Sequence, residues 1–362
     1  MRCSPTAENG QRKHMHRLAE FRPGDLPHRM LAQVLAARGA QDHWLQLAST
    51  AILVLGAPRS GTTWLAKIFD SHPEVLYRHE PDELSPPNTT LDLAAQIAVW
   101  LRQRGLRAAG KRPHFAKSWR PPPQAAARSV LGTMLSAAER LPLLHHIAAQ
   151  LPLPDLVASS NWGRVRAAIK LVNWDGAAAA RAIPGTRSIF ILRHPCGQVA
   201  SVLAGQAASL LDDGTGQGRL SDRYPAFAEA YAACHGVDAA TFAVLPEAAR
   251  LAWAWRAFNE PALINLQDRP NARVVLHEDI CRDPEPVARD LFAFAGLPWH
   301  PQTGTFLQDS TNHDRDAGYF DVFRASASVA EKWRQTMDRR DQEAVRSVIA
   351  GTDLAGHWSD LR

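Results

Sequence analysis

Short runs of consecutive apolar residues alternate with amphipathic stretches along much of the chain. Residues 51–56 (AILVLG) form one such run, which is typical of a strand buried on both faces of a parallel sheet. The same pattern, with Gly and Pro as boundaries, predicts strands at Ala51–Gly56, Val75–His79, Ala167–Val172, Arg187–Leu192 and Ala272–His277. Apolar residues at helical spacing predict helices at Leu31–Leu47, Thr62–Asp70, Leu91–Gln103, Asp175–Ile183, Gly197–Ala204, Glu247–Leu266, Glu285–Ala295, Val329–Gln335 and Asp338–Ala350, with a loop at Leu211–Asp222.

The regular alternation of strands and helices predicts an α/β fold with one central parallel sheet, covered by helices on both faces. We expect residues 1–50 to form an N-terminal helical extension and residues 51–362 to form a single domain. Residues 85–165 interrupt the alternation. Within them we expect one or two helices across Ala125–Gln150, after a rigid break at Pro121–Pro123.

The composition is that of a folded globular protein, with 362 residues of which 46% are apolar and 21% charged. Lys and Arg outnumber Asp and Glu by 41 to 36, a net charge of +5 that suits an anionic ligand but is too small to indicate nucleic-acid binding. The apolar runs are far shorter than the ~20 residues of a membrane span. The N-terminus is polar, so we expect neither stable membrane insertion nor secretion.

The four cysteines, Cys3, Cys196, Cys234 and Cys281, are widely scattered. None of them pairs at the short spacing of structural zinc ligands, so we expect no metal cluster. Four cysteines in a chain of this length are more typical of reduced thiols than of a disulfide framework, which favours a cytoplasmic protein.

The stretch that carries most chemical information is GAPRSGTTWL, which follows the first predicted strand. Gly56 and Gly61 have the spacing of a phosphate-binding loop, in which backbone N–H groups and the helix dipole bind an anion. Thr62 occupies the position of the lysine that reaches the β- and γ-phosphates of ATP or GTP, while Arg59 supplies a charge within the loop. The sequence therefore predicts binding of a single phosphate-like group. The alternative is a turn that binds nothing.

These residues resemble the 5′-phosphosulfate loop of the sulfotransferases that use 3′-phosphoadenosine-5′-phosphosulfate (PAPS), and the continuation AKIFDSHPEVLYRHEP is similar to the carbohydrate and tyrosyl-protein members and their bacterial relatives. The resemblance implies a single P-loop-like domain that transfers a sulfuryl group from PAPS to an acceptor hydroxyl. The product would be 3′,5′-ADP, and no metal would be required. The resemblance also assigns the 5′-phosphosulfate to Arg59, Ser60, Gly61, Thr62, Thr63 and Trp64, although Trp64 is equally well interpreted as a core residue.

A second motif lies at the end of the predicted strand Arg187–Leu192, where Arg193 is followed eight residues later by Ser201. Arg193 is predicted at the carboxyl edge of the sheet, where α/β proteins bind ligands, and a guanidinium group makes charge-assisted bonds to phosphate. The pair resembles the family's 3′-phosphate motif. By itself the spacing is weak, since it also describes a surface arginine and a helical serine. His194 stands where the family commonly has Asp, and we expect it to be structural.

Sulfuryl transfer requires a base for the acceptor hydroxyl and neutralisation of charge on the sulfuryl and phosphate oxygens. The resemblance assigns the base to Glu80, with His79 as a competing base. It assigns assistance to the leaving group to Lys170, sulfuryl or 5′-phosphate contacts to Ser310 and nucleotide phosphate contacts to Lys332. The structural alternatives are a capping carboxylate, a surface lysine and residues that pack the C-terminal tail.

An acidic segment, Glu278 to Asp283, follows the last predicted strand. We interpret it as structural, with its carboxylates capping the helix that begins near Glu285. Asp279 as a magnesium ligand is the minority interpretation.

Residues 85–165 lack the family similarity and are expected to cover the acceptor site. They carry Trp100, Trp119 and a cluster of basic residues, Arg102, Arg104, Arg107, Lys111, Arg112, Lys117 and Arg120. This cluster suits an acidic sugar or lipid headgroup, or is a solvated surface. We expect the acceptor to be a saccharide, a glycolipid or a small metabolite, and we expect no nucleic-acid partner, with a homodimer left open. A divergent P-loop kinase and a non-catalytic nucleotide-binding protein remain alternatives.

Overall fold

The computed structural model describes residues 43–85, 91–105, 108, 130–134, 137–138, 151–153, 155, 163–171, 185–207, 220–312 and 330–361. The chain divides into two compact units, Met1–His43 and Trp44–Arg362. Apart from His43, the first unit lies outside the described residues, and so does most of the helix predicted at Leu31–Leu47. The architecture below is that of the second unit.

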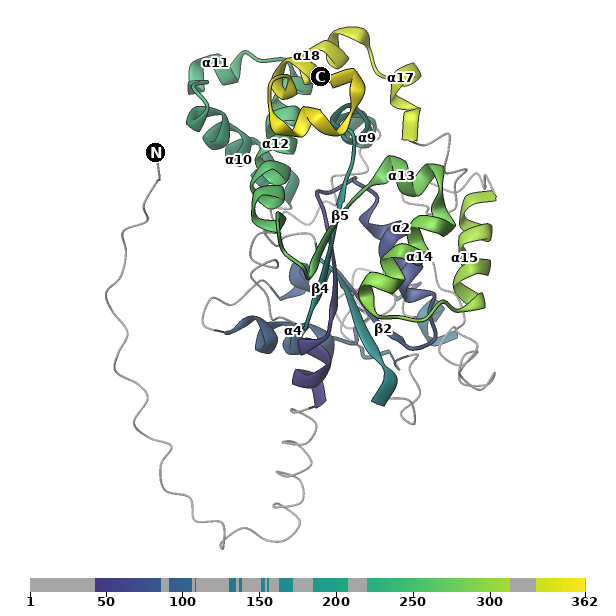
Figure 1. Ribbon diagram of the computed structural model, residues 1–362. Helices are drawn as coiled ribbons and strands as arrows, with labels where there is room; N and C mark the ends of the chain where they lie inside the picture. The colour runs from purple at the N-terminus through teal and green to yellow at the C-terminus, as the bar shows by residue number, and fades with distance from the viewer. Residues whose placement is uncertain are drawn as a thin grey trace, which may run out of the picture. The chain divides into compact units, whose positions relative to one another are not determined.

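Five parallel strands form the sheet of the described chain (Figure 1). They are β1 (Ile52–Leu55), β2 (Val75–His79), β3 (Arg166–Lys170), β4 (Arg187–Leu192) and β5 (Ala272–Leu276), in the order β2-β3-β1-β4-β5. The register pairs Val54 of β1 with Lys170 on one side and with Ile189 on the other. The predicted α/β fold with a parallel sheet is therefore confirmed.

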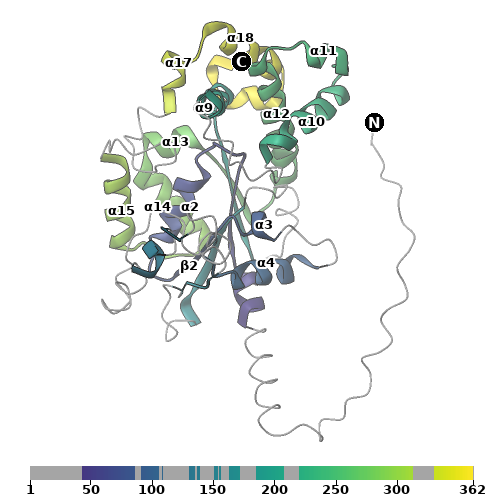
Figure 2. The ribbon, with the colours of Figure 1, turned by 180° about the vertical axis from the view of Figure 1, so that it is seen from behind.

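Helices cover both faces of this sheet, as Figures 1 and 2 show from opposite sides. One face carries α2 (Thr62–Asp70), α13 (His277–Arg282), α14 (Pro284–Ala295) and α15 (Pro301–Asn312). The other face carries α4 (Leu93–Arg102), α9 (Pro195–Ala207), α10 (Leu220–Cys234), α12 (Glu247–Leu266) and α18 (Arg339–Ile349). The shorter elements are α3 (Pro81–Leu84), α11 (Ala239–Ala243), α17 (Trp333–Thr336), η2 (Asp353–His357) and η3 (Ser359–Leu361).

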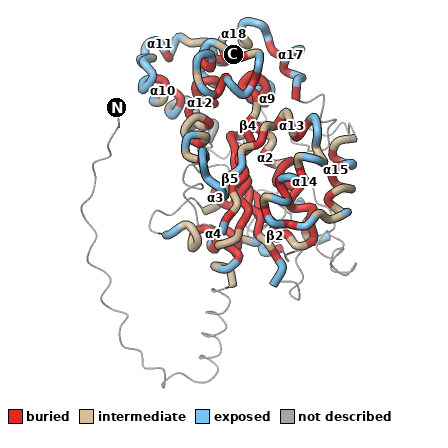
Figure 3. Tube along the Cα trace, in the orientation of Figure 1, coloured by how far each residue is buried: buried red, intermediate tan, exposed pale blue. Residues whose placement is uncertain are grey.

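Strands β1 to β4 are buried because both faces of the sheet are covered, whereas the edge strand β5 is only partly buried (Figure 3). In β1, Leu53 and Leu55 pack into the core beneath α9 and α12, whereas Ile52 and Val54 pack into the core beneath α2 and α14. A strand with two apolar faces needs apolar residues at every position. The continuous apolar run in the sequence therefore predicted its position correctly.

Most element bounds agree with the sequence prediction, and the differences have local causes. Helix α9 starts at Pro195, two residues earlier than predicted, because proline is well tolerated in the first turn of a helix. The predicted loop is wrong at Leu220–Asp222, which begin α10. The helices predicted at Asp175–Ile183 and across most of Ala125–Gln150, like Pro121–Pro123, lie outside the described residues.

Within the part of the chain that the structure describes, no helix combines the length and the apolar character needed to cross a bilayer.

Candidate active site

The carboxyl ends of neighbouring strands bring the predicted site residues to one edge of the sheet. Strand β1 leads into the glycine loop, β2 ends at His79, and β3 ends at Lys170. Strand β4 leads to Arg193 on the opposite side of β1. The connections that follow β1 and β4 therefore lead to opposite edges of the sheet. In parallel α/β sheets, ligands bind in the crevice where two such connections diverge.

The glycine loop between β1 and α2 has the backbone of an anion-binding turn. Arg59 has φ 69° and Gly61 φ 95°, both in the left-handed region, and the Ser60 hydroxyl donates to the Ala57 carbonyl at 2.6 Å. Gly61 is the N-cap of α2, and no side chain caps the helix there. A Cβ at Gly61 would lie 2.5 Å from Cδ2 of His277, so only glycine fits.

The first turn of α2 contains the remaining predicted loop residues. Thr62 is buried and Thr63 is half-buried. Trp64 is buried and donates from Nε1 to Oγ of Ser310 at 3.1 Å, so a residue of α15 is fixed against the glycine loop. The Ser310 hydroxyl in turn donates to the carbonyl of Leu307 at 3.1 Å.

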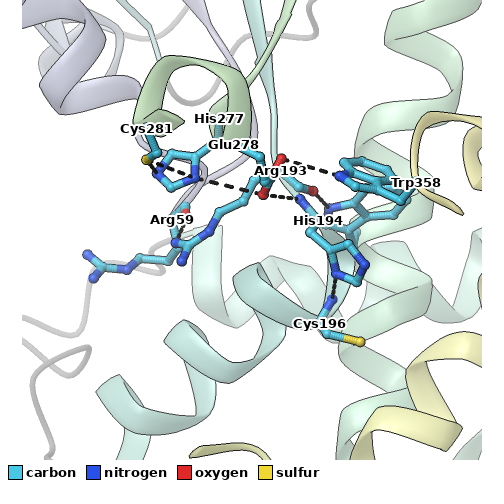
Figure 4. Close-up of polar contacts among 9 residues, drawn as sticks. Arg59, Arg193, His194, Cys196, His277, Glu278, Cys281 and Trp358 are labelled. Atoms are coloured by element: carbon cyan, nitrogen blue, oxygen red, sulfur yellow. Dashed lines mark hydrogen bonds and ion pairs between the residues drawn. The ribbon is translucent and has the colours of Figure 1, made fainter. Parts of the chain in front are cut away.

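Arg59 connects the glycine loop with the second motif. Its Nε donates to Oγ of Ser201 at 3.2 Å, and its carbonyl accepts from Nη1 of Arg193 at 2.8 Å. A parallel link joins the two segments where Nε2 of Gln198 donates to the Pro58 carbonyl at 2.8 Å. In Figure 4 the Arg193 side chain extends toward Arg59. The backbone of Arg59 thus belongs to the loop, while its guanidinium lies with Ser201.

Glu80 and Lys170 form an ion pair at the ends of β2 and β3. The exposed fractions of their side chains are 13% and 3%, so the pair is mostly withdrawn from water. Glu80 also donates its backbone N–H to the Lys170 carbonyl at 2.8 Å. Its φ of 47° is left-handed, which is unfavourable for a non-glycine residue and more so before Pro81. Such strain tends to persist at functional sites.

Buried charges lie behind this pair, between α2 and β2. Lys67 pairs with Asp70 at 2.9 Å and lies 4.7 Å from the centre of the Tyr77 ring. Burial raises the pKa of Tyr77 well above its ordinary value, and the negative charges of Asp70 and Glu80 raise it further. The phenol is therefore a permanent hydrogen-bond donor. Nothing in the local sequence signals that Tyr77 is a hydrogen-bond donor, because an aromatic residue in an apolar strand is ordinarily a core residue.

Lys332 immediately precedes α17 and is exposed. The next residue, Trp333, is buried and stacks on the His194 ring with centroids 4.4 Å apart. Lys332 is thus carried by the segment that packs on the Arg193–His194 turn. His194 itself is buried, in agreement with a structural role.

The capping role predicted for the acidic segment is wrong. Asp283 is the N-cap of α14 but makes no side-chain capping hydrogen bond, and its Oδ2 accepts instead from Nε of Arg282 at 3.1 Å. Glu278 instead accepts the backbone N–H of His194 at 3.0 Å and the indole N–H of Trp358 at 3.3 Å. Sequence reasoning assigned Glu278 to the wrong structural role, since its partners are distant in the chain. Among the described residues, no group of His, Cys, Asp and Glu side chains could hold a metal ion.

Comparison with known proteins places the glycine loop and the segment from Arg193 to Ser201 in one family. A family model described as "Sulfotransferase family" matches residues 51–246, the stretch from the glycine loop through Arg193 and Ser201. Carbohydrate sulfotransferase 5 of Mus musculus is 37% identical over 99 residues, which are 26% of this chain and 25% of that protein. Carbohydrate sulfotransferase 3 of Homo sapiens is 32% identical over 76 residues, 21% of this chain and 16% of that protein. The chain therefore aligns with a quarter or less of the length of these relatives.

Solved structures show a more distant similarity. The sulfotransferase domain from the curacin biosynthetic pathway is 14% identical, with 82% of this chain and 96% of that chain covered and a TM-score of 0.39. Mouse sulfotransferase SULT7A1 complexed with PAP is 12% identical, with coverages of 84% and 86% and a TM-score of 0.40. Both TM-scores are low, so the family match identifies the chain and these structures do not.

Proposed function

This chain belongs to the sulfotransferase family, and we propose that it transfers a sulfuryl group from PAPS to a hydroxyl group of an acceptor. The observation that carries the proposal is the hydrogen-bonded set of Arg193, Arg59 and Ser201 beside the glycine loop. Two guanidinium groups and a hydroxyl next to an amide-lined turn suit a nucleotide with anionic groups at both its 5′ and 3′ positions.

The glycine loop fits the 5′ end of PAPS. Gly61 leaves no room for a Cβ, and the first turn of α2 has no side-chain cap, so oxygens of an anionic ligand can accept from the amides of Thr62 and Thr63. PAPS supplies a sulfuryl group joined to its 5′-phosphate by an anhydride bond, whose cleavage leaves 3′,5′-ADP. Thr62 offers no ammonium group for a triphosphate, which argues against the kinase alternative.

We assign the 3′-phosphate to Arg193, Ser201 and the guanidinium of Arg59. The contact of Nε of Arg59 with Ser201 supports this extension of the arginine's role, since its charge lies with the second motif. Lys332, exposed beside Trp333, would add a further positive charge to the nucleotide phosphates.

Glu80 is proposed as the base and Lys170 as the cation that assists the leaving group. Glu80 would take the proton of the acceptor hydroxyl as the new O–S bond forms and the bond from sulfur to the phosphate oxygen breaks. The ion pair between Glu80 and Lys170 supports one shared site for both roles. Ser310 could donate to a sulfuryl oxygen only after its hydroxyl leaves the Leu307 carbonyl.

The acceptor is proposed to be a saccharide or a small metabolite. The carbohydrate sulfotransferases among the relatives support the first choice. A reducing compartment, the cytoplasm, is supported by Cys196, Cys234 and Cys281, which form no disulfide.

Incubation with radiolabelled PAPS and a panel of saccharide and small-molecule acceptors tests the proposal. We expect a labelled product, release of 3′,5′-ADP, activity that survives EDTA, and tighter binding of 3′,5′-ADP than of ATP. Magnesium-dependent activity with tighter ATP binding would favour a kinase. Nucleotide binding without transfer to any acceptor would favour a non-catalytic nucleotide-binding protein.

A further inference from the structure

The peptide bond between Arg193 and His194 is held on both of its polar sides. Its N–H, which belongs to His194, donates to Oε1 of Glu278 at 3.0 Å. Its carbonyl, which belongs to Arg193, accepts from Nε1 of Trp255 at 3.1 Å. One donor and one acceptor from α12 and α13 therefore fix the plane of this peptide as β4 ends.

A second layer fixes Glu278 itself. Its other carboxylate oxygen, Oε2, accepts from the indole N–H of Trp358 at 3.3 Å, and the Trp358 ring lies 6.2 Å from that of Trp255. Trp358 follows η2 near the end of the chain, 80 residues after Glu278. Figure 4 shows the two bonds that reach Glu278, one from the His194 backbone N–H and one from the Trp358 indole. The three residues Trp255, Glu278 and Trp358, here called the peptide clamp, come from separate parts of the chain.

The His194 ring fills the space behind the clamped peptide. It stacks on Trp333 at an interplanar angle of 16°, meets the edge of Trp358, and accepts the Cys196 N–H on Nδ1 at 3.2 Å. Its place in this packing leaves little freedom for rotation about the Arg193–His194 bonds. The backbone at Arg193 sets the direction in which its side chain leaves the chain. By fixing that backbone, the clamp also directs the Arg193 guanidinium toward Arg59, whose carbonyl accepts from Nη1 at 2.8 Å.

We infer that Trp255, Glu278 and Trp358 are positioning residues that hold Arg193 for the 3′-phosphate and so set the preference of the protein for 3′-phosphorylated nucleotides. This inference rests on the proposed function, since it requires Arg193 to bind that phosphate. A charge-assisted bond to phosphate depends strongly on the direction of the guanidinium fork, so a small loss of orientation weakens it selectively. The glycine loop holds the 5′ end with its own backbone amides and meets Arg193 at the Arg59 carbonyl, so binding of the 5′ end depends less on the clamp.

Calorimetry with 3′,5′-ADP and 5′-AMP tests the inference in the variants Trp358→Phe and Glu278→Gln. Trp358→Phe removes one N–H with a modest loss of volume. Glu278→Gln retains the shape of the side chain, but its amide N–H group then faces either the His194 N–H or the Trp358 N–H, so one of these two hydrogen bonds is lost. We expect each variant to bind 3′,5′-ADP about tenfold more weakly, the effect of one hydrogen bond to a charged group, and to bind 5′-AMP within twofold of the unmodified protein. Trp299→Phe, on the other face of the sheet beside Phe292, is the matched control and should change neither affinity.

A double-mutant cycle with Arg193→Ala separates positioning from general destabilisation. If the clamp acts through Arg193, Trp358→Phe has no further effect on 3′,5′-ADP binding once the guanidinium is gone. Equal weakening of both nucleotides, or additive effects in the cycle, would overturn the inference. If Trp358→Phe does not fold, Glu278→Gln and Trp255→Phe give the same comparison. An unmodified protein that binds neither nucleotide, or both equally, would instead contradict the proposed function.

Discussion

Tyr77 and His79 share a short hydrogen bond at the carboxyl end of β2, with Oη of Tyr77 2.6 Å from Nδ1 of His79. The other ring nitrogen, Nε2, lies 3.4 Å from Oε1 of Glu80. A lone pair on Nε2 would repel the carboxylate, which favours the tautomer with the proton on Nε2 and with Nδ1 accepting from the phenol. In this tautomer His79 turns an N–H toward Glu80, and its Nδ1 lone pair is taken by Tyr77. This arrangement favours Glu80 over His79 as the base.

Replacing Tyr77 with Phe should lower kcat without affecting nucleotide binding. The change removes the donor to Nδ1, so the second tautomer of His79 becomes accessible and Glu80 is oriented less well. We expect kcat to fall about fivefold, equivalent to one neutral hydrogen bond of about 1 kcal/mol, with KM for PAPS within twofold of the unmodified protein. Steady-state assays with radiolabelled PAPS measure both. The control is Tyr231→Phe, which removes the hydrogen bond that the Tyr231 phenol of α10 donates to Glu260 of α12. An unchanged kcat would show that the tautomer of His79 does not matter.

Replacing Glu80 with Gln should abolish most of the turnover and leave the nucleotide site intact. A general base contributes about 10²–10⁴-fold, so we expect kcat to fall at least about a hundredfold. Calorimetry should give the same affinity for 3′,5′-ADP, because the phosphate groups are bound elsewhere. Glu83→Gln, an exposed position in α3, should retain full activity. A fully active Glu80→Gln together with an inactive His79→Asn would transfer the base role to His79.

The sheet was predictable from sequence because the central strands β1 and β4 are buried on two faces and carry apolar runs, ILVL in the one and IFIL in the other. The bounds of β4 and α12 agree with prediction to the residue. Helix α15 was not predicted, since its sequence PQTGTFLQDSTN contains only two large apolar residues, Phe306 and Leu307. Those two residues nevertheless fix the helix on the α2 face of the sheet. Tertiary packing therefore stabilises it more than its own pattern does.

The meeting of candidate site residues follows most simply from the sequence where they come directly after a strand. Glu80 and Lys170 lie at the ends of β2 and β3, and the parallel sheet brings such ends together without further information. Glu278 could not be assigned in this way, because its bond to the His194 N–H joins residues 84 apart in the chain. Contacts of this kind depend on packing of the completed fold, which leaves no local pattern.

Replacing Gly61 with Ala should remove nucleotide binding and lower stability. The new Cβ would lie 2.5 Å from the His277 ring, and the φ of 95° is strained for any residue with a Cβ. We expect a loss of about 1–3 kcal/mol in the free energy of unfolding and no measurable binding of 3′,5′-ADP. Thermal unfolding and calorimetry measure the two effects. Gly132→Ala, at a helical position where a Cβ meets nothing within 4 Å, is the control and should not reduce stability. Unaltered binding in Gly61→Ala would argue against an anion in this loop.

His194 should make the stability of the protein depend on pH on the acidic side. Burial lowers its pKa from 6.5 to about 4, although Asp360 and Glu278 raise it and Arg334 lowers it further. Between these values the unfolded chain binds the proton and the folded protein does not, so the free energy of unfolding rises with pH. The contribution of the neutral His194 ring to the free energy of unfolding is about 3 kcal/mol. It is fully present above about pH 6.5 and is lost as the pH falls toward about 4.

The variant His194→Asn isolates this contribution from that of other titrating groups. Urea unfolding at about pH 7 and about pH 4 should show the stability difference between the unmodified protein and the variant shrinking by about 3 kcal/mol at the lower pH. If the two curves for His194→Asn and the unmodified protein run parallel, the imidazole takes up its proton equally in the folded and unfolded states. In that case burial beneath Trp333 does not keep the ring neutral.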